Sequence, residues 1–151
     1  MEEIRENRRP VVEITNLYKS YGSNKVLDGF NLKLYEGENL VVMGKSGSGK
    51  SVMIKCLIGL EEPDSGSISI MGQAIKTLSR EQLDELRTEI GFLFQGSALY
   101  DSMSVRENLE FPLRRHTKKF GVIKDTTPLV MEALQNVGLA NAIDLMPNEL
   151  S

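Results

Sequence analysis

Apolar and polar positions divide the chain into a strand-rich first part and a helical second part. The β-branched run at 11–15 predicts a strand, and alternating apolar and polar residues at 30–35 and 67–71 predict two half-buried strands. Residues 40–43 and 90–94 are apolar throughout, which is typical of strands buried on both faces of a sheet. The first part of the chain is therefore expected to form a sheet.

Helices are predicted by apolar periodicity and by capping signals. One follows the glycine-rich segment and ends at Gly59, with buried positions expected at Val52, Ile54, Leu57 and Ile58. Capping boxes that begin at Ser79 and Ser104 open two more helices, and Pro112 should bend or end the second. Thr127 should cap a last helix that has Pro128 first and stops at Gly138, with an apolar face of Leu129, Val130, Ala133, Leu134 and Val137.

The segment 44–51 lies between a predicted strand and a predicted helix, and it has the spacing of a phosphate-binding loop, Gly-x-x-x-x-Gly-Lys-Ser. Its glycines permit backbone angles that a side chain forbids, so that amides can approach phosphates closely. Lys50 can place its ammonium between the β- and γ-phosphates, and Ser51 can offer its hydroxyl to Mg²⁺. ATP and Mg²⁺ are therefore the expected ligands of Gly44, Lys45, Ser46, Gly47, Ser48, Gly49, Lys50 and Ser51.

Composition narrows the class of protein and of partner. With 151 residues, 40% of them hydrophobic and 26% charged, the chain is long enough for a domain with a core. A net charge of −3 without a basic block excludes nucleic acid as an electrostatic partner. The single cysteine, Cys56, fits a reducing compartment and reads as a buried apolar residue. No stretch approaches the about 20 apolar residues that span a bilayer, so a cytoplasmic location is expected.

Five stretches in order make the sequence resemble the ATP-binding subunit of an ABC transporter from about Val12 onward. They are 21–22 with 26–29, the phosphate loop, 60–66, 91–95 and 150–151. The resemblance implies an α/β fold with a P-loop NTPase (RecA-like) core, an antiparallel β subdomain and the start of a helical subdomain, as an incomplete domain. Residues 1–10 would be a charged lead-in, 11–95 the first part of the core, and 96–151 the start of the helical signature subdomain.

The resemblance also implies roles for four further residues. Tyr21 matches the aromatic residue that stacks on adenine, and Val26 would lie against the ribose or adenine. Gln95 matches the glutamine that contacts Mg²⁺ and the attacking water, and Ser151 the signature serine that contacts the γ-phosphate held by the other protomer. The expected catalytic residues are Lys50, Gln95 and Ser151. Without the family, Tyr21 is equally a turn-edge tyrosine packed on the sheet, and Gln95 a polar residue at a strand end.

A narrower match concerns 93–113, which resembles the subgroup that serves bacterial phospholipid transport, the Mla-type complexes with MCE-domain partners. The resemblance implies a head-to-tail dimer with a second ATP-binding protomer, bound to transmembrane permease subunits. The protein would then lie peripherally at the inner face of the membrane.

Two parts of the expected hydrolytic site are missing from the 151 residues. The signature stops at Ser151 before its two glycines, and no apolar strand ends in Asp-Glu. Glu61 and Glu62 follow the loop helix, and Asp144 sits in a helical stretch, so none of these carboxylates replaces the missing Asp-Glu pair. His116 reads as a solvated residue at a helix end. We expect an N-terminal fragment of a longer gene product that binds ATP without hydrolysing it efficiently.

Three alternatives remain open from the sequence. A soluble P-loop kinase would need a lid with several arginines, and the match from Gln95 to Ser151 speaks against it. A non-hydrolysing ABC-type interaction module would bind nucleotide without turnover. A soluble ABC ATPase would lack membrane subunits, and neighbouring genes for a permease and an MCE-domain protein would decide against it.

Overall fold

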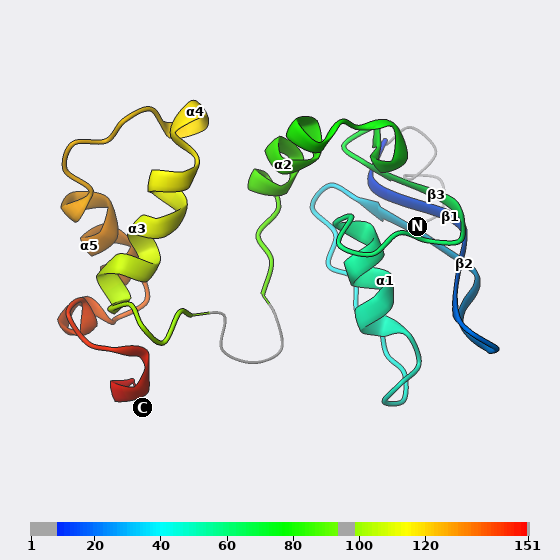
Figure 1. Ribbon diagram of the computed structural model, residues 1–151, viewed down its shortest axis with the longest axis horizontal. Helices are drawn as coiled ribbons and strands as arrows, with labels where there is room; N and C mark the ends of the chain where they lie inside the picture. Colours follow the sequence, from blue (N-terminus) through cyan, green and yellow to red (C-terminus); the bar gives the residue numbers. More distant parts are fainter. Residues whose placement is uncertain (1–8, 94–98, 151) are drawn as a thin grey trace. The chain divides into compact units, whose positions relative to one another are not determined.

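The computed structural model describes residues 9–93 and 99–150 (Figure 1). The chain forms two compact units, one made of residues 1–91 and the other of residues 92–151. The first unit holds the sheet and the phosphate loop, and the second unit is helical.

An antiparallel sheet forms the first unit, and its strand order is β2-β1-β3-β4. The strands are β1 (Pro10–Tyr21), β2 (Asn24–Tyr35), β3 (Ser65–Ile70) and β4 (Gln73–Ala74). The strands predicted at 11–15, 30–35 and 67–71 are confirmed, although β1 and β2 are longer than the pattern indicated. Tyr21 pairs with Asn24, so β1 and β2 form a hairpin with a tight turn.

One glycine fixes how β3 begins against β1. At Asn16 the backbone has a positive φ of 45°, and the register of the β1–β3 pairing shifts between Thr15 and Tyr18. Gly66 lies directly over this irregularity with φ 98°, and a β-carbon there would be 2.3 Å from the Asn16 carbonyl oxygen. Because no side chain fits at 66, glycine is what allows β3 to pair with this irregular part of β1.

Helix α1 (Lys50–Leu57) lies against one face of the sheet (Figure 1). Its buried residues Met53 and Cys56 join a core that also contains Ile14, Leu17, Leu27, Ile68, Ile70 and Leu86. Cys56 is fully buried, as predicted, and burial raises the pKa of its thiol. The predicted burial of Ile54 is wrong, since its side chain is 37% exposed: the face of α1 that meets the sheet is centred on 53 and 56.

The end of α1 is closed by a glycine and by an arginine. Gly59 has φ 66° and donates its amide to the Cys56 carbonyl at 3.0 Å, which ends the helix where predicted. Arg87 donates to the carbonyls of Ile58 and Gly59, both at 2.9 Å. It comes from α2 (Arg80–Thr88), which follows the short 3-10 helix η1 (Ile75–Thr77) and begins with the predicted capping box at Ser79. A cation therefore faces the negative end of α1.

The second unit packs α3 (Val105–Arg115) against α5 (Thr127–Asn136). Its core consists of Val105, Val130 and Leu134. Shorter elements complete it: α4 (Thr117–Phe120), η2 (Ala140–Ala142) and η3 (Pro147–Glu149). The capping box predicted at Ser104 is confirmed. Among the residues described, no helix is long and apolar enough to cross a membrane.

Glu110 is a buried carboxylate of this second unit. Only 6% of the residue is exposed, yet its oxygens accept hydrogen bonds from Arg114 and from the Thr126 hydroxyl. A buried carboxylate needs such partners because desolvation of an unpaired charge is costly. Glu110 thus joins α3 to the segment before α5.

Three predictions about the helices are wrong in part. Pro112 does not end α3, which continues to Arg115, and the Pro112 carbonyl accepts the His116 amide at 3.0 Å. Thr127 is itself helical and does not cap α5; Asp125 Oδ1 accepts its amide instead at 3.0 Å. That hydrogen bond also lowers the pKa of Asp125. The apolar face of α5 is narrower than predicted, since Leu129, Ala133 and Val137 are exposed.

The strands predicted at 40–43 and 90–94 are the main disagreement. Residues 40–43 carry no strand structure, and Val41 and Met43 are 77% and 87% exposed. Residues 90–93 are likewise irregular, and 94 lies outside the described residues. None of the strands in the described ranges pairs with either segment. An apolar run becomes a strand only where a neighbour accepts and donates its backbone hydrogen bonds.

Replacing Leu17 with alanine tests the core of the first unit. Leu17 has no exposed surface, so Leu17→Ala should lower the free energy of unfolding by about 2–5 kcal/mol, through lost burial and the cavity left behind. Leu60→Ala is the control, because Leu60 is 53% exposed and should cost less than about 1 kcal/mol. Urea unfolding of the protein that contains this chain measures both. Equal effects would contradict the placement of Leu17.

Candidate functional site

The phosphate loop is a tight, exposed turn that leads into α1. Within it the Ser48 amide donates to the Lys45 carbonyl at 3.2 Å, and Gly47 has φ 79°. Each residue from 40 to 48 is exposed, so the backbone amides of the loop are accessible from solvent. A turn of this kind gathers backbone N–H groups into a concave anion-binding surface.

Lys50 folds back over this loop. Its ammonium donates to the carbonyls of Gly44 and Lys45 at 2.6 and 2.8 Å, and lies 3.4 Å from the Ser48 hydroxyl. All three of these acceptors are uncharged oxygens, so no carboxylate among these contacts pairs with the ammonium. The ammonium therefore lies against the loop itself, at Gly44, Lys45 and Ser48.

Gly49 brings the loop against the β1–β2 hairpin. It is buried, has φ 88°, and stands immediately before the first residue of α1. A β-carbon at 49 would be 2.8 Å from the Val26 carbonyl oxygen and 2.9 Å from Val26 Cγ1. The structure thus places Val26, one of the predicted nucleotide contacts, directly beside the phosphate loop.

The first turn of α1 adds a positive field. The N–H groups of a first helical turn have no partner within the helix and carry the positive end of the helix dipole. This turn contains no acidic residue, and Ser51 within it is exposed. Loop, lysine and helix start together have the chemistry to hold a triphosphate, and the Ser51 hydroxyl is the group here suited to an accompanying Mg²⁺.

Tyr21 stands at the tip of the same hairpin and is 47% exposed. Lys19 Nζ lies 5.4 Å from the centre of its ring, within the range of a cation–π contact. The pKa of its phenol is raised, first by desolvation and then by the nearby Glu61 carboxylate. The ring therefore has a defined position and still presents area to solvent.

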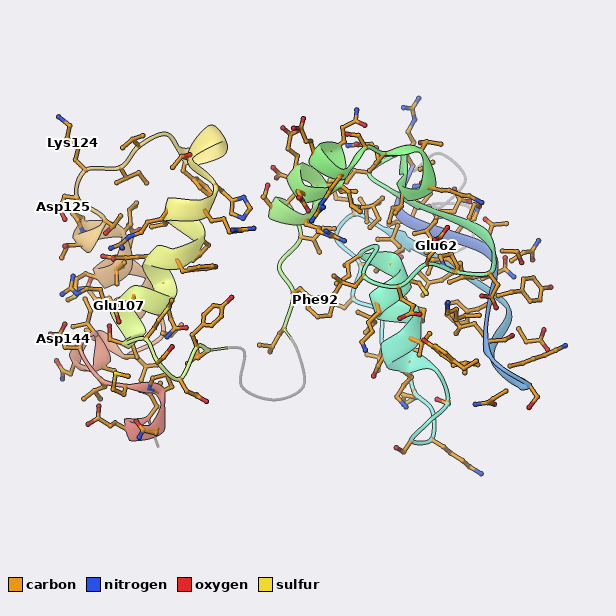
Figure 2. The ribbon with its side chains drawn as sticks, in the orientation of Figure 1. Glu62, Phe92, Glu107, Lys124, Asp125 and Asp144 are labelled. Carbon is orange, nitrogen blue, oxygen red and sulfur yellow. The ribbon has the colours of Figure 1, made fainter. Side chains whose placement is uncertain are left out.

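Lys19 and Glu61 were not identified from the sequence as functional residues. Lys19 Nζ is 3.2 Å from Glu61 Oε1 and 3.6 Å from Asp64 Oδ1, and it donates to the Glu62 carbonyl at 2.7 Å. In Figure 2, the labelled Glu62 shows where the loop 61–64 lies beside the sheet. The Glu61 hydrogen bond raises the pKa of Lys19, and the same bond lowers that of Glu61, so both are charged at neutral pH. The available signal was Lys19 two residues before Tyr21 in a strand, which places both on one face.

The two remaining predicted site residues, Gln95 and Ser151, lie outside the described residues. No group of three or more His, Cys, Asp or Glu side chains gathers as a metal site in the part of the chain that the structure covers. Among the described residues, the candidate site consists of 44–51, Val26 and the tip of the hairpin.

Comparison with known proteins identifies the fold. The sequence profile of the family described as "ABC transporter" matches residues 27–151. A dimeric solved structure, the ATP-binding cassette MJ0796 bound to ADP and Pi, matches 93% of this chain and 63% of its own, with TM-score 0.78 and 31% identity. The predicted fold class, a P-loop NTPase core with an antiparallel β subdomain, is confirmed.

Two curated relatives align over nearly the whole chain. The "Probable ribonucleotide transport ATP-binding protein mkl" of Mycobacterium leprae is 45% identical over 93% of this chain. The "Methionine import ATP-binding protein MetN" of Clostridium tetani is 38% identical over 93% of it. The chain spans 40% and 43% of the lengths of these two relatives. Because the family profile covers well over half of its residues, the chain belongs to the ABC transporter ATP-binding family.

Proposed function

We propose that this chain binds Mg-ATP at 44–51 and forms part of the ATP-binding subunit of a transporter. The observation that carries the proposal is the closure of the loop: Gly49 packs on Val26 while the Lys50 ammonium lies across the loop. This arrangement brings backbone amides, a helix start and a cation together in one exposed loop. A triphosphate is the ligand that uses all three.

The roles follow from position. The loop amides and the start of α1 would hold the phosphates, and Lys50 would exchange its carbonyl partners for phosphate oxygens. Ser51 would contact Mg²⁺, whose charge offsets that of the phosphates. Val26 and Tyr21 would contact the ribose and adenine from the adjacent hairpin. For Gln95 and Ser151, the roles near Mg²⁺ and at the partner's γ-phosphate rest on resemblance alone.

In the whole protein, we propose that two copies close head to tail around nucleotide. The MJ0796 cassette, which is described as a dimer bound to ADP and Pi, supports this assembly. Each nucleotide would then lie between one phosphate loop and the signature serine of the other copy. Hydrolysis would reopen the dimer, and the movement would pass to permease subunits that hold the protein at the inner face of the membrane.

For the transported substrate we propose phospholipid, with an MCE-domain partner. The support is the segment 93–113, whose sequence resembles the phospholipid-transport subgroup. The relatives are named for other cargo, ribonucleotide for mkl and methionine for MetN. Ribonucleotide is the second candidate, because the mkl protein is 45% identical to this chain.

Lys50→Ala tests the phosphate site in the full-length protein that contains this chain. Hydrogen bonds to charged groups contribute about 1.5–3 kcal/mol, so ATP affinity should fall about tenfold to a hundredfold, and turnover should be lost. Titration calorimetry with Mg-ATP measures the affinity. Lys55→Ala, in the last turn of the same helix, is the control and should bind normally. Unchanged affinity and turnover in Lys50→Ala would refute the role of this lysine.

Gly49→Ala tests the close approach to Val26. Its matched control is Gly72→Ala: both glycines have positive φ, 88° and 77°, but a β-carbon at 72 meets no atom within 4 Å. The control should lose about 1–2 kcal/mol from backbone strain. Gly49→Ala should lose about 1–3 kcal/mol more from overpacking, and ATP binding with it. Equal stability and equal ATP affinity in the two variants would contradict the proposal.

The cargo proposal is tested with the complete transporter. Reconstituted with its permease and MCE-domain partners in vesicles, it should hydrolyse ATP faster when phospholipid is supplied and should move labelled phospholipid between membranes. Ribonucleotide is the comparison substrate. Stimulation by ribonucleotide, with none by phospholipid, overturns the cargo proposal and leaves the nucleotide site standing.

A further inference from the structure

The ammonium of Lys19 is enclosed by the loop that follows α1. Its side chain is only 14% exposed, and three groups of that loop surround it: the Glu61 and Asp64 carboxylates and the Glu62 carbonyl. A lysine this far removed from water is unusual unless it is paired. The arrangement therefore requires the loop 61–64 and the end of β1 to stay together.

Tyr21 is held by this enclosed lysine. Lys19 Nζ is 5.4 Å from the ring centre, within the range of a cation–π contact, and it lies 3.2 Å from the Glu61 carboxylate that holds it. The contact limits where the ring lies. Since Tyr21 remains 47% exposed, part of the ring stays open to a ligand.

Anchoring of the loop does not require this contact. Asp64 already ties the loop to β1, because its Oδ2 accepts the Ser20 amide at 2.7 Å and its own amide donates to the Tyr18 carbonyl at 2.9 Å. The contact of Lys19 with the Tyr21 ring adds nothing to this attachment of the backbone. What it does add is a fixed position for an exposed aromatic ring.

We infer that Lys19 and Glu61 are positioning residues that hold the Tyr21 ring in the orientation in which it receives the nucleotide base. The inference rests on the proposed function, in which Tyr21 contacts adenine. A ring fixed before binding loses less conformational freedom when the base arrives, which strengthens binding. The two residues act through Tyr21 and do not touch the nucleotide themselves.

The test separates recognition of the base from recognition of the phosphates. In the full-length protein, dissociation constants are measured for Mg-ATP and for inorganic tripolyphosphate, which lacks base and ribose. Lys19→Met removes the cation beside the ring, and Glu61→Gln removes the charge that holds this cation. Each should weaken ATP binding about twofold to fivefold, the worth of one exposed cation–π contact. Tripolyphosphate binding should stay the same.

Matched controls come from the same elements. Glu62→Gln alters the neighbouring carboxylate of the loop, and Lys33→Met breaks the exposed pair of Lys33 with Glu13 (2.7 Å) on the same hairpin. Both should leave the ratio of ATP to tripolyphosphate affinity unchanged. Lys19→Met should lower this ratio, and Lys19→Arg should restore most of it. A readout without nucleotide is the NMR spectrum of the Tyr21 ring, which Glu61→Gln should alter and Glu62→Gln should not.

The outcomes distinguish this inference from the function on which it rests. If the unaltered protein binds neither compound, the phosphate site fails and the inference with it. If ATP binds no better than tripolyphosphate, the base contact of Tyr21 is wrong and so is the inference. If ATP is preferred but Lys19→Met and Glu61→Gln keep that preference or increase it, the positioning role alone is overturned.

Discussion

The close contact between Gly49 and Val26 is the constraint on which both the core and the site depend. A side chain at 49 has no room, since its β-carbon would be 2.8 Å from the Val26 carbonyl oxygen. That contact sets where α1 begins relative to the hairpin. Lys50 and Ser51 follow at once on the exposed side, while Met53 and Cys56 enter the core on the other. The same helix is thereby buried for stability and open at its first turn for an anion.

The charges around α1 are arranged along its axis. Its first turn has no acidic residue and carries Lys50, so a negative ligand meets no repulsion there. Beyond its last turn lie Glu61 and Asp64, whose charges are balanced by Lys19, while Arg87 donates to the final carbonyls. Glu61 and Asp64 are thus engaged at the end opposite to the phosphate loop. This separation keeps the loop available for phosphate.

Local chemistry was predictable from the sequence, and contacts between distant segments were not. The glycine spacing of 44–51 and the serine caps at 79 and 104 act within a few residues, and the structure has the two capping boxes and the loop turn where the sequence put them. The apolar run 40–43 was expected to be a strand, but composition does not supply a hydrogen-bonding neighbour. The pairing of Lys19 with Glu61 was also not predicted, because it joins a strand to a loop far along the chain.

We propose that the hairpin tip and the phosphate loop form one nucleotide site. Photoaffinity labelling with 8-azido-ATP, followed by peptide mass spectrometry, is the direct test, because the reactive group sits on the base. Label is expected on the peptide that contains Tyr21 and Val26, and excess ATP should abolish it. Label confined to the second unit, or label on the hairpin that excess ATP does not displace, would contradict the proposal.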